Sequence, residues 1–369
     1  MIPFFLLYVY LAIASFCCFR LKSISLKRAI FFITSIYIWL FISLRNISVG
    51  TDTITYVQFF SNPNFYYHGK PTDVMFEYLG RLLRSLGRSK EFFIFSTGTF
   101  SFFGIFYLIR NISPNKIFSV VLFSIVGTTS MFFFLYLSMI RQACAMSLFF
   151  FSLIYFFEKK NWQKYLGLVL YLMSILMHGS AVFALPFLLI ISIYRIDNKI
   201  IWAAGFVISY LYAVNPWFST TELIKIAYPI VSSFLSRDYS HYMQLSFGYI
   251  PAKGFFNMDL LPFMIFGFYG LRFLTTEDLH KWYVQLFMFS IILNNVLSDN
   301  YMWPRLVLYF SIFSIIVIPY IYDRLFGIYK YSFATFIFTY YPYKIFRQLL
   351  HQASNHALGN IVIPYKIFF

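Results

Sequence analysis

The stretch "IPFFLLYVYLAIASFCCFRLKSISLKR", residues 2–28, decides the fold class. Its first part, 2–19, carries no charge and is about as long as a helix needs to be to cross a bilayer. The charges follow the apolar run instead of preceding it, which favours a first membrane span over a cleavable signal peptide. The basic cluster after it predicts a cytoplasmic loop and consists of Arg20, Lys22, Lys27 and Arg28.

The composition of the whole chain agrees with this start. Hydrophobic residues make up 60% of the chain and charged residues 11%, and the mean hydropathy is +0.71, which excludes an ordinary water-soluble domain. The apolar residues come in unbroken runs, as in membrane helices, whereas a membrane barrel would alternate apolar and polar residues. We therefore expect an all-α, polytopic integral membrane protein with about 10–12 transmembrane helices.

The runs also predict how the chain is organised. We expect a single membrane domain over 1–369, with larger outer loops at 46–90 and 215–258. The candidate spans are 2–19, 29–45, 91–109, 117–137, 142–157, 165–178, 180–194, 200–214, 259–274, 282–298, 304–322 and 330–341. The pair 165–178 and 180–194 is either one broken helix or two tilted helices. Every short loop that this order places inside carries at least two basic residues, so the chain is expected to start outside.

The net charge of +16 bears on the partners of the protein. The basic residues are scattered among the spans, so no nucleic acid is expected, and an anionic bilayer or a phosphate-bearing substrate explains the charge better. The cysteines, Cys17, Cys18 and Cys144, all lie in predicted spans without metal-ligand spacing. We expect no metal, because the outer acidic residues are few and ungrouped. We also expect no cofactor, since the chain has no Walker loop.

Polar residues from separate stretches gather at the outer ends of the predicted spans. An arginine inside a membrane costs about 2.5–3.5 kcal/mol on insertion scales and therefore usually faces a cavity or a partner. Taken singly, each arginine could also reach the lipid headgroups with its long side chain. Together they predict one shared anion site, because the planar guanidinium grips phosphate oxygens in pairs. The residues concerned are Arg45, Asp52, Arg141, His178 and Arg305.

Two of these residues leave alternatives open. His178, in "SILMHGSAVFALPFLL" (174–189), is either a hydrogen-bonded structural residue or a proton carrier near neutral pH. Asp52 follows Gly50, which permits a turn, and "TDTITYVQFF" (51–60) reads equally well as the capped start of a helix. In the competing interpretation, Asp52 is a general base or a ligand of sugar hydroxyls.

The second outer loop contains "SRDYSHYMQ", residues 236–244. Arg237, Tyr239 and Tyr242 would offer hydrogen bonds and aromatic faces to a sugar. Tyrosines are also common at membrane interfaces, so this pattern alone carries little weight.

Five stretches, in this order, resemble the EpsG-type family of Wzy-like polysaccharide polymerases, and the resemblance covers nearly the whole chain. They are "RNISVGTDTITYVQFF" (45–60), "IRQACAMSLFFFSL" (140–153), "MHGSAVFALPFLL" (177–189), "PRLVLYF" (304–310) and "IPYKIFF" (363–369). The resemblance implies a bacterial enzyme that joins undecaprenyl-pyrophosphate-linked oligosaccharide repeat units at the periplasmic face of the inner membrane. The product would be O-antigen, capsule or exopolysaccharide, and a chain-length regulator would be a partner.

The resemblance also implies roles for the residues that match its motifs. A hydroxyl of the next repeat unit would attack the anomeric carbon of the growing glycan, and the lipid pyrophosphate would leave. Either Asp52 or His178 would take the acceptor proton, while Arg141 and Arg305 would clamp the pyrophosphate. The expected substrate-binding residues are Arg45, Gly50, Thr51, Tyr56, Gln142, Arg237, Tyr239 and Tyr242.

Two other functions remain as alternatives. An O-antigen ligase uses the same donor at the same face, but transfers the glycan to a lipid core. A flippase for the lipid-linked repeat would show two pseudo-symmetric halves with polar residues at both faces. Here the polar residues lean towards one face, which favours an enzyme.

Overall fold

The computed structural model describes residues 2–50, 52–62, 73–127, 132–215, 260–298 and 304–354. Every regular element in these ranges is a helix, and no β-strand occurs in them. The helices at 24–43, 90–112, 140–158 and 305–324 are long and apolar enough to cross a membrane, judged by length and composition, and six shorter apolar helices accompany them. The all-α, polytopic membrane class predicted from the sequence is confirmed.

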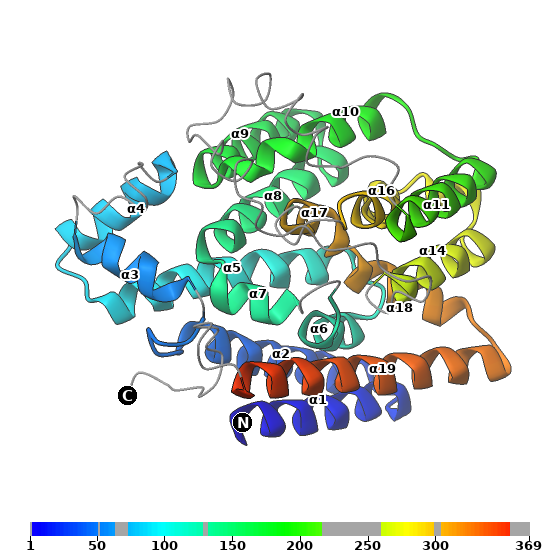
Figure 1. Ribbon diagram of the computed structural model, residues 1–369, viewed down its shortest axis with the longest axis horizontal. Helices are drawn as coiled ribbons and strands as arrows, with labels where there is room; N and C mark the ends of the chain where they lie inside the picture. Colours follow the sequence, from blue (N-terminus) through cyan, green and yellow to red (C-terminus); the bar gives the residue numbers. More distant parts are fainter. Residues whose placement is uncertain are drawn as a thin grey trace. The chain divides into compact units, whose positions relative to one another are not determined.

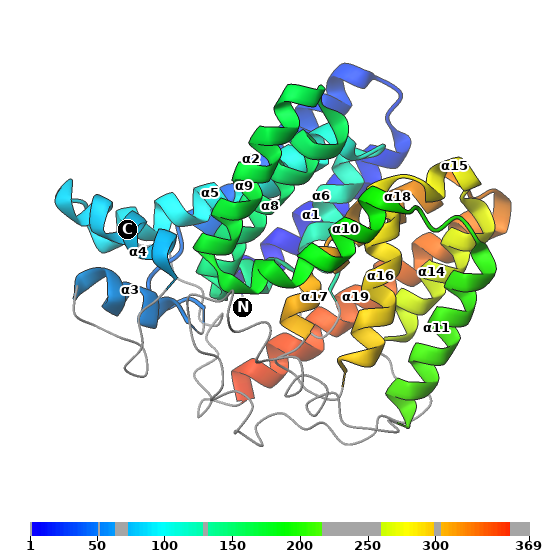
Figure 2. The ribbon, with the colours of Figure 1, turned by 90° about the horizontal axis from the view of Figure 1, so that it is seen from above.

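The chain divides into two compact units, which are described separately below. The first contains Met1–Val126, Ser130–His178 and Lys330–Phe369, and the second contains Gly127–Thr129 and Gly179–Tyr329. The single membrane domain expected from the sequence stays a prediction. Figure 1 shows the helices coloured along the chain, and Figure 2 shows them from above.

The first unit is built from helices of both ends and of the middle of the sequence. They are α1 (Ile2–Arg20), α2 (Ile24–Ser43), α3 (Thr53–Ser61), α4 (Val74–Ser85), α5 (Lys90–Ile112), α6 (Lys116–Ile125), α7 (Phe132–Ser138), α8 (Ile140–Glu158), α9 (Asn161–Met177) and, beyond its first turn, α19 (Gly327–Ser354). Several begin at a side chain that accepts a hydrogen bond from the first turn, as Ser23 does for α2, Ser89 for α5 and Asn115 for α6.

Helix α8 lies at the centre of the first unit and packs against both α5 and α9. Small residues allow the close approach: a Cβ on Gly104 of α5 would lie 2.4 Å from the Cα of Ser147 of α8. The Ser147 hydroxyl donates to the Ser101 carbonyl of α5 (2.7 Å), and the Ser174 hydroxyl of α9 donates to the Ala145 carbonyl of α8 (2.7 Å). Hydrogen bonds between helices thus add to the packing of the central layer.

Two features of the first unit differ from the expected spans. The run 117–137 is not one helix, because α6 ends at Ile125 and α7 begins at Phe132. The backbone N–H of Phe132 donates to the Val126 carbonyl across the break (3.1 Å). The expected outer loop 46–90 also contains two short helices, α3 and α4. The other expected outer loop, apart from its first residue, lies outside the described residues.

The second unit is a separate helical cluster in which α16 packs against α11 and α17. Its core includes Trp202, which is fully buried with its ring centroid 5.0 Å from that of Phe289. The expected span 180–194 begins as a 3₁₀ helix, distinct from α9. The elements are η1 (Gly179–Ala184), α10 (Leu185–Ile193), α11 (Lys199–Val214), α14 (Leu261–Phe273), α15 (Thr276–Leu279), α16 (Trp282–Val296), α17 (Pro304–Ser311) and α18 (Ser314–Arg324).

An ionic cluster around Asp278 ties α15 to its neighbours in this unit. One carboxylate oxygen accepts from Lys281 (2.8 Å) and from the Tyr320 hydroxyl (3.0 Å), and the other accepts from Arg324 (2.9 Å) and Thr275 (3.0 Å). Burial works to raise the pKa of Asp278, but the hydrogen bonds from Lys281, Tyr320 and Thr275 outweigh it and lower the pKa to about 2. The Asp278 carboxylate is therefore ionised in the folded protein near neutral pH.

Candidate functional site

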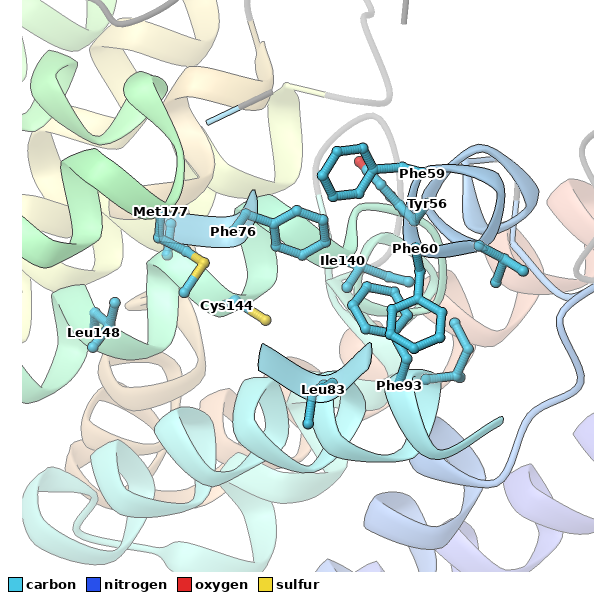
Figure 3. Packing of buried hydrophobic residues seen from close by; sticks show 13 residues of the cluster. Tyr56, Phe59, Phe60, Phe76, Leu83, Phe93, Ile140, Cys144, Leu148 and Met177 are labelled. Carbon is cyan, nitrogen blue, oxygen red and sulfur yellow. The ribbon is translucent and has the colours of Figure 1, made fainter. Parts of the chain in front are cut away.

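A cluster of aromatic rings fixes α3 and α4 against the central helices of the first unit (Figure 3). The rings of Phe60 on α3 and Phe93 on α5 are stacked with centroids 4.7 Å apart. Phe76 on α4 meets Phe93 at 5.8 Å and Tyr56 at 5.6 Å. All four side chains are buried. Because this face of α4 is held in a packed core, the first residues of the helix are held as well.

Asp73 lies at the N-cap position of α4, but its side chain makes no capping hydrogen bond. Its carboxylate instead meets two side chains from other helices. The Oδ2 atom lies 2.8 Å from Nη1 of Arg141, at the start of α8, and 2.9 Å from Nδ1 of His178, at the end of α9. Side chains separated by 68 and 105 positions in the sequence thus meet at one oxygen atom.

The electrostatics of this group follow from its burial. The Asp73 side chain is 0% exposed, whereas those of Arg141 and His178 are 12% and 15% exposed. A buried carboxylate is costly to desolvate unless it is paired, and Arg141 supplies the opposite charge. An ionised carboxylate only accepts hydrogen bonds, so Nδ1 of His178 is the donor in this contact. In the tautomer that carries its proton on Nδ1, the lone pair of the ring lies on Nε2.

The end of α9 presents the imidazole to Asp73. The helix ends at Met177, and His178 has an extended backbone with φ −160° and ψ 116°. Its N–H still donates to the Ser174 carbonyl (3.0 Å), which fixes the residue to the last helical turn. The 3₁₀ helix η1 starts directly afterwards at Gly179. His178 therefore lies at a change of backbone geometry, where its side chain is not restricted to the surface of a helix.

Tyr56 also lies against Arg141. The guanidinium carbon of Arg141 lies 5.4 Å from the centroid of the Tyr56 ring, within the range of a cation–π interaction. Tyr56 itself is buried on α3. The arginine is thus oriented by a carboxylate from α4 and by an aromatic face from α3.

The turn between α2 and α3 has a structural reason for its glycine. Gly50 has a φ of +100°, and a Cβ at this position would lie 2.0 Å from the carbonyl oxygen of Leu137 at the end of α7. Next to it, the Thr53 hydroxyl donates to the carbonyls of Val49 (2.8 Å) and Leu137 (3.3 Å). Arg45, before the turn, is fully buried and donates to the Ile42 carbonyl. The segment is therefore docked tightly on α7.

The other expected site residues are placed as follows. Asp52 is the half-buried residue before α3, and Gln142 is buried next to Arg141 on α8. Arg305 lies half-buried at the start of α17 in the second unit, so its expected meeting with Arg141 stays a prediction. Four further residues lie outside the described part of the chain, namely Thr51, Arg237, Tyr239 and Tyr242.

The structure brings Arg141 and His178, both expected from the sequence, to a residue that sequence reasoning missed, and it places the expected Tyr56 against Arg141. Asp73 belongs to the expected first outer loop and is one of 13 acidic residues in the chain. It directly precedes the amphipathic stretch "VMFEYLGRLLRS" (74–85), as an N-cap residue does. That pattern marks a helix start, but it does not show which residues the carboxylate will meet.

The described ranges contain no group of three or more His, Cys, Asp or Glu side chains that could hold a metal ion.

Comparison with known proteins gives one match. A model of the EpsG family matches residues 28–367. No curated protein and no solved structure matches the chain.

Proposed function

The chain belongs to the EpsG family of Wzy-like polymerases, and from this premise we propose that it joins undecaprenyl-pyrophosphate-linked oligosaccharide repeat units into a polysaccharide. The reaction takes place at the periplasmic face of the bacterial inner membrane, and the product is O-antigen, capsule or exopolysaccharide. The observation that carries the proposal is the contact of Asp73 Oδ2 with both Arg141 and His178. These three residues come from the segments that the positive-inside rule predicts to lie at the outer face.

The proposed reaction is a glycosyl transfer. A hydroxyl oxygen of the acceptor repeat attacks the anomeric carbon of the growing glycan, while the bond from that carbon to the pyrophosphate oxygen breaks. The acceptor proton passes to Nε2 of His178, and the lipid pyrophosphate leaves with the bonding electron pair. Asp73 acts as a positioning residue, because it holds the tautomer and the orientation of the imidazole.

Arg141 would stabilise the negative charge that develops on the leaving pyrophosphate. A guanidinium carries five N–H donors, so the bond to Asp73 is compatible with a second contact to an anion. Its partial burial strengthens such a contact, because water screens it less. Arg305 would add a second cation to the same pyrophosphate, and Asp52, the other expected base, would bind sugar hydroxyls.

The test is a gel of surface glycan from a strain that lacks this protein. The strain receives a plasmid with the wild-type protein or with one of its variants. We expect wild type and Arg110→Ala to restore long polymer. Arg110 is an exposed residue in the last turn of α5, whereas the aromatic cluster lies at the first turn of that helix. Arg141→Ala and His178→Ala should leave single capped repeats, although the proteins reach the membrane in normal amount. Normal chain-length ladders from both variants would refute the proposed site.

The same gel separates the alternatives. Loss of a ligase would leave long polymer that is not attached to the lipid core. Loss of a flippase would leave lipid-linked repeats on the cytoplasmic side and no capped repeat at the surface. A purified protein that converts lipid-linked repeats into a ladder and releases undecaprenyl pyrophosphate would establish polymerase activity directly.

A further inference from the structure

One side of α4 is apolar and exposed, and we call it the outer face of the helix. Val74, Tyr78, Leu82 and Leu86 recur every four residues, so they lie along one side of the helix and its C-cap. Tyr78 is 66% exposed and Leu82 56%. The opposite side, which includes Phe76 and belongs to the buried aromatic cluster described above, is turned into the unit. One short helix therefore has two apolar faces, of which only one is buried.

A basic stripe borders this exposed face. Arg81 and Arg84 are three residues apart and lie on a neighbouring side of the helix, and Arg88 follows the turn at Gly87 (φ +65°) that ends it. Arg81 forms an ion pair with Glu77 one turn earlier. In the described part of the chain, Arg84 and Arg88 form no ion pair, and the guanidinium of Arg88 lies 5.0 Å from the centroid of the Phe92 ring. The border of the apolar face is thus cationic.

The position of α4 along the chain sets its depth. The helix ends at Ser85, and the candidate membrane span α5 begins at Lys90. Its buried face, through Phe76, packs on Phe93, which lies in the first turn of α5 (Figure 3). A helix held against the first turn of a membrane span lies at the level where that span enters the bilayer. This is the headgroup region, where lipids have both apolar and charged groups.

We infer that α4 lies in the surface of an anionic phospholipid leaflet, with Tyr78 and Leu82 among the upper acyl chains and with Arg84 and Arg88 on the headgroup phosphates. An amphipathic helix at this depth buries its apolar side by about 5–10 Å. Guanidinium groups on its border bind phosphate oxygens through paired hydrogen bonds. The inference requires only that the chain is a membrane protein, and it is independent of the glycan that is transferred.

A second copy of the chain fits this face less well than lipid does. In a two-fold contact the same surface occurs on both partners, so the arginine stripes would be brought near each other. Like charges at a contact are unfavourable, whereas anionic headgroups are complementary to them. The charge of the border thus favours lipid as the occupant.

The test places a polarity-sensitive nitrobenzoxadiazole label on the outer face. The full chain, with its native cysteines replaced by alanine, receives Tyr78→Cys or Leu82→Cys and is placed in nanodiscs of phosphatidylglycerol or of phosphatidylcholine. In phosphatidylglycerol we expect blue-shifted emission that is quenched by lipids with a doxyl group near the headgroup. In phosphatidylcholine both effects should be weaker.

Charge variants make the test specific. Each arginine removed should weaken the binding of phosphatidylglycerol headgroups at this face by about fivefold. Arg84→Glu with Arg88→Glu should therefore reduce the doxyl quenching strongly. The matched control, Arg110→Glu, makes the same type of charge change at the far end of α5 and should leave the quenching unchanged.

Three results would overturn the inference. Quenching by aqueous iodide without quenching by doxyl lipids would place the face in water. Insensitivity to both quenchers would show that protein covers the face. Equal doxyl quenching in both lipids, unchanged by the charge variants, would rule out recognition of anionic headgroups. The comparison of the two lipids needs no charge variant, so it remains decisive if Arg84→Glu or Arg88→Glu prevents folding.

Discussion

Asp73 gives the candidate site its geometry. Sequence reasoning selected Arg141 and His178 because polar residues at the outer ends of membrane spans are costly and tend to converge. It could not select Asp73, because the capping pattern before α4 is shared by many helices without a site. What distinguishes Asp73 is the complete burial of its side chain, and burial depends on tertiary packing.

The first prediction concerns the proposed base. His178→Ala should lower the polymerisation rate by about 10²–10⁴-fold, the usual contribution of a general base. Because Arg141 still pairs with Asp73, the melting temperature should fall only by the loss of one hydrogen bond to the buried carboxylate. The rate is measured with purified protein in nanodiscs and lipid-linked repeats as substrate.

Added imidazole separates a chemical role from a structural one. If His178 transfers the proton, free imidazole should restore part of the rate of His178→Ala, whereas it should not affect Arg141→Ala. A lower melting temperature without rescue would instead assign His178 a structural role. Full activity of His178→Ala would leave Asp52 as the expected base.

The second prediction concerns the buried charge pair. Asp73→Asn removes the counter-charge of Arg141, and breaking a buried pair from one side typically costs about 3–5 kcal/mol. We expect this loss in the free energy of unfolding, measured by denaturation in detergent. Asp73→Asn combined with Arg141→Gln should cost clearly less than the sum of the two single changes. Additive losses would show that the two side chains do not interact.

The helices were predicted unequally well from the sequence. The positions of α2, α5 and α8 follow from their apolar runs to within a few residues, because a span must be long and uncharged. The break between α6 and α7 was missed because the run 117–137 is apolar on both sides of it. Its only sequence signal is "GTTS" at 127–130, a group of small residues that favours non-helical backbone.

The third prediction concerns α15, α16 and α18, which Asp278 connects. Since the pKa of Asp278 is lowered to about 2, below the unfolded value of about 3.9, its stabilisation is complete above about pH 5. This stabilisation is lost as the pH falls through the pKa that Asp278 has in the folded protein. Asp278→Asn should therefore destabilise the protein by about 1–2 kcal/mol at pH 7, because the partly exposed Lys281 and Arg324 are screened by water.

The measurement is the melting temperature of Asp278→Asn and wild type between pH 3 and pH 8. The difference in melting temperature between wild type and Asp278→Asn should stay constant from pH 6 to pH 8 and narrow below about pH 4. Glu277→Gln is the matched control, because Glu277 is the exposed neighbour and forms no ion pair in the described residues. A difference that widens as the pH falls would contradict the assignment.

The fourth prediction concerns the side of the membrane on which each loop of the protein lies. The positive-inside rule predicts that Asp73 and His178 lie outside, and the structure shows the two side chains in contact. Alkaline phosphatase fused after Asn62 or Asn215 should therefore be active, because it folds only outside the cytoplasm. Fusions after Ser113 or Lys160 should be inactive. A result that places Asp73 and His178 on opposite sides of the membrane would contradict the proposed site.

The division of the chain into units was not visible in the sequence. Hydropathy locates spans one at a time, but it does not show which spans pack together. The first unit joins the N-terminal helices to α19, which lies more than 300 positions after α1. The ring centroid of Phe338 on α19 lies 6.2 Å from that of Phe19 and 6.0 Å from that of Phe118. Such distant pairings depend on side-chain shape and are not encoded in local periodicity.

The use of α19 in the first unit has a consequence for biogenesis. A ribosome delivers the chain from its N-terminus, so α1 and α6 enter the membrane long before the helix that covers them has been translated. In the interval, Phe19 and Phe118 must be sheltered by lipid or by an insertion factor. A nascent chain stalled before Lys330 should therefore be degraded faster than one released after Ser354, even though both already contain Asp73, Arg141 and His178.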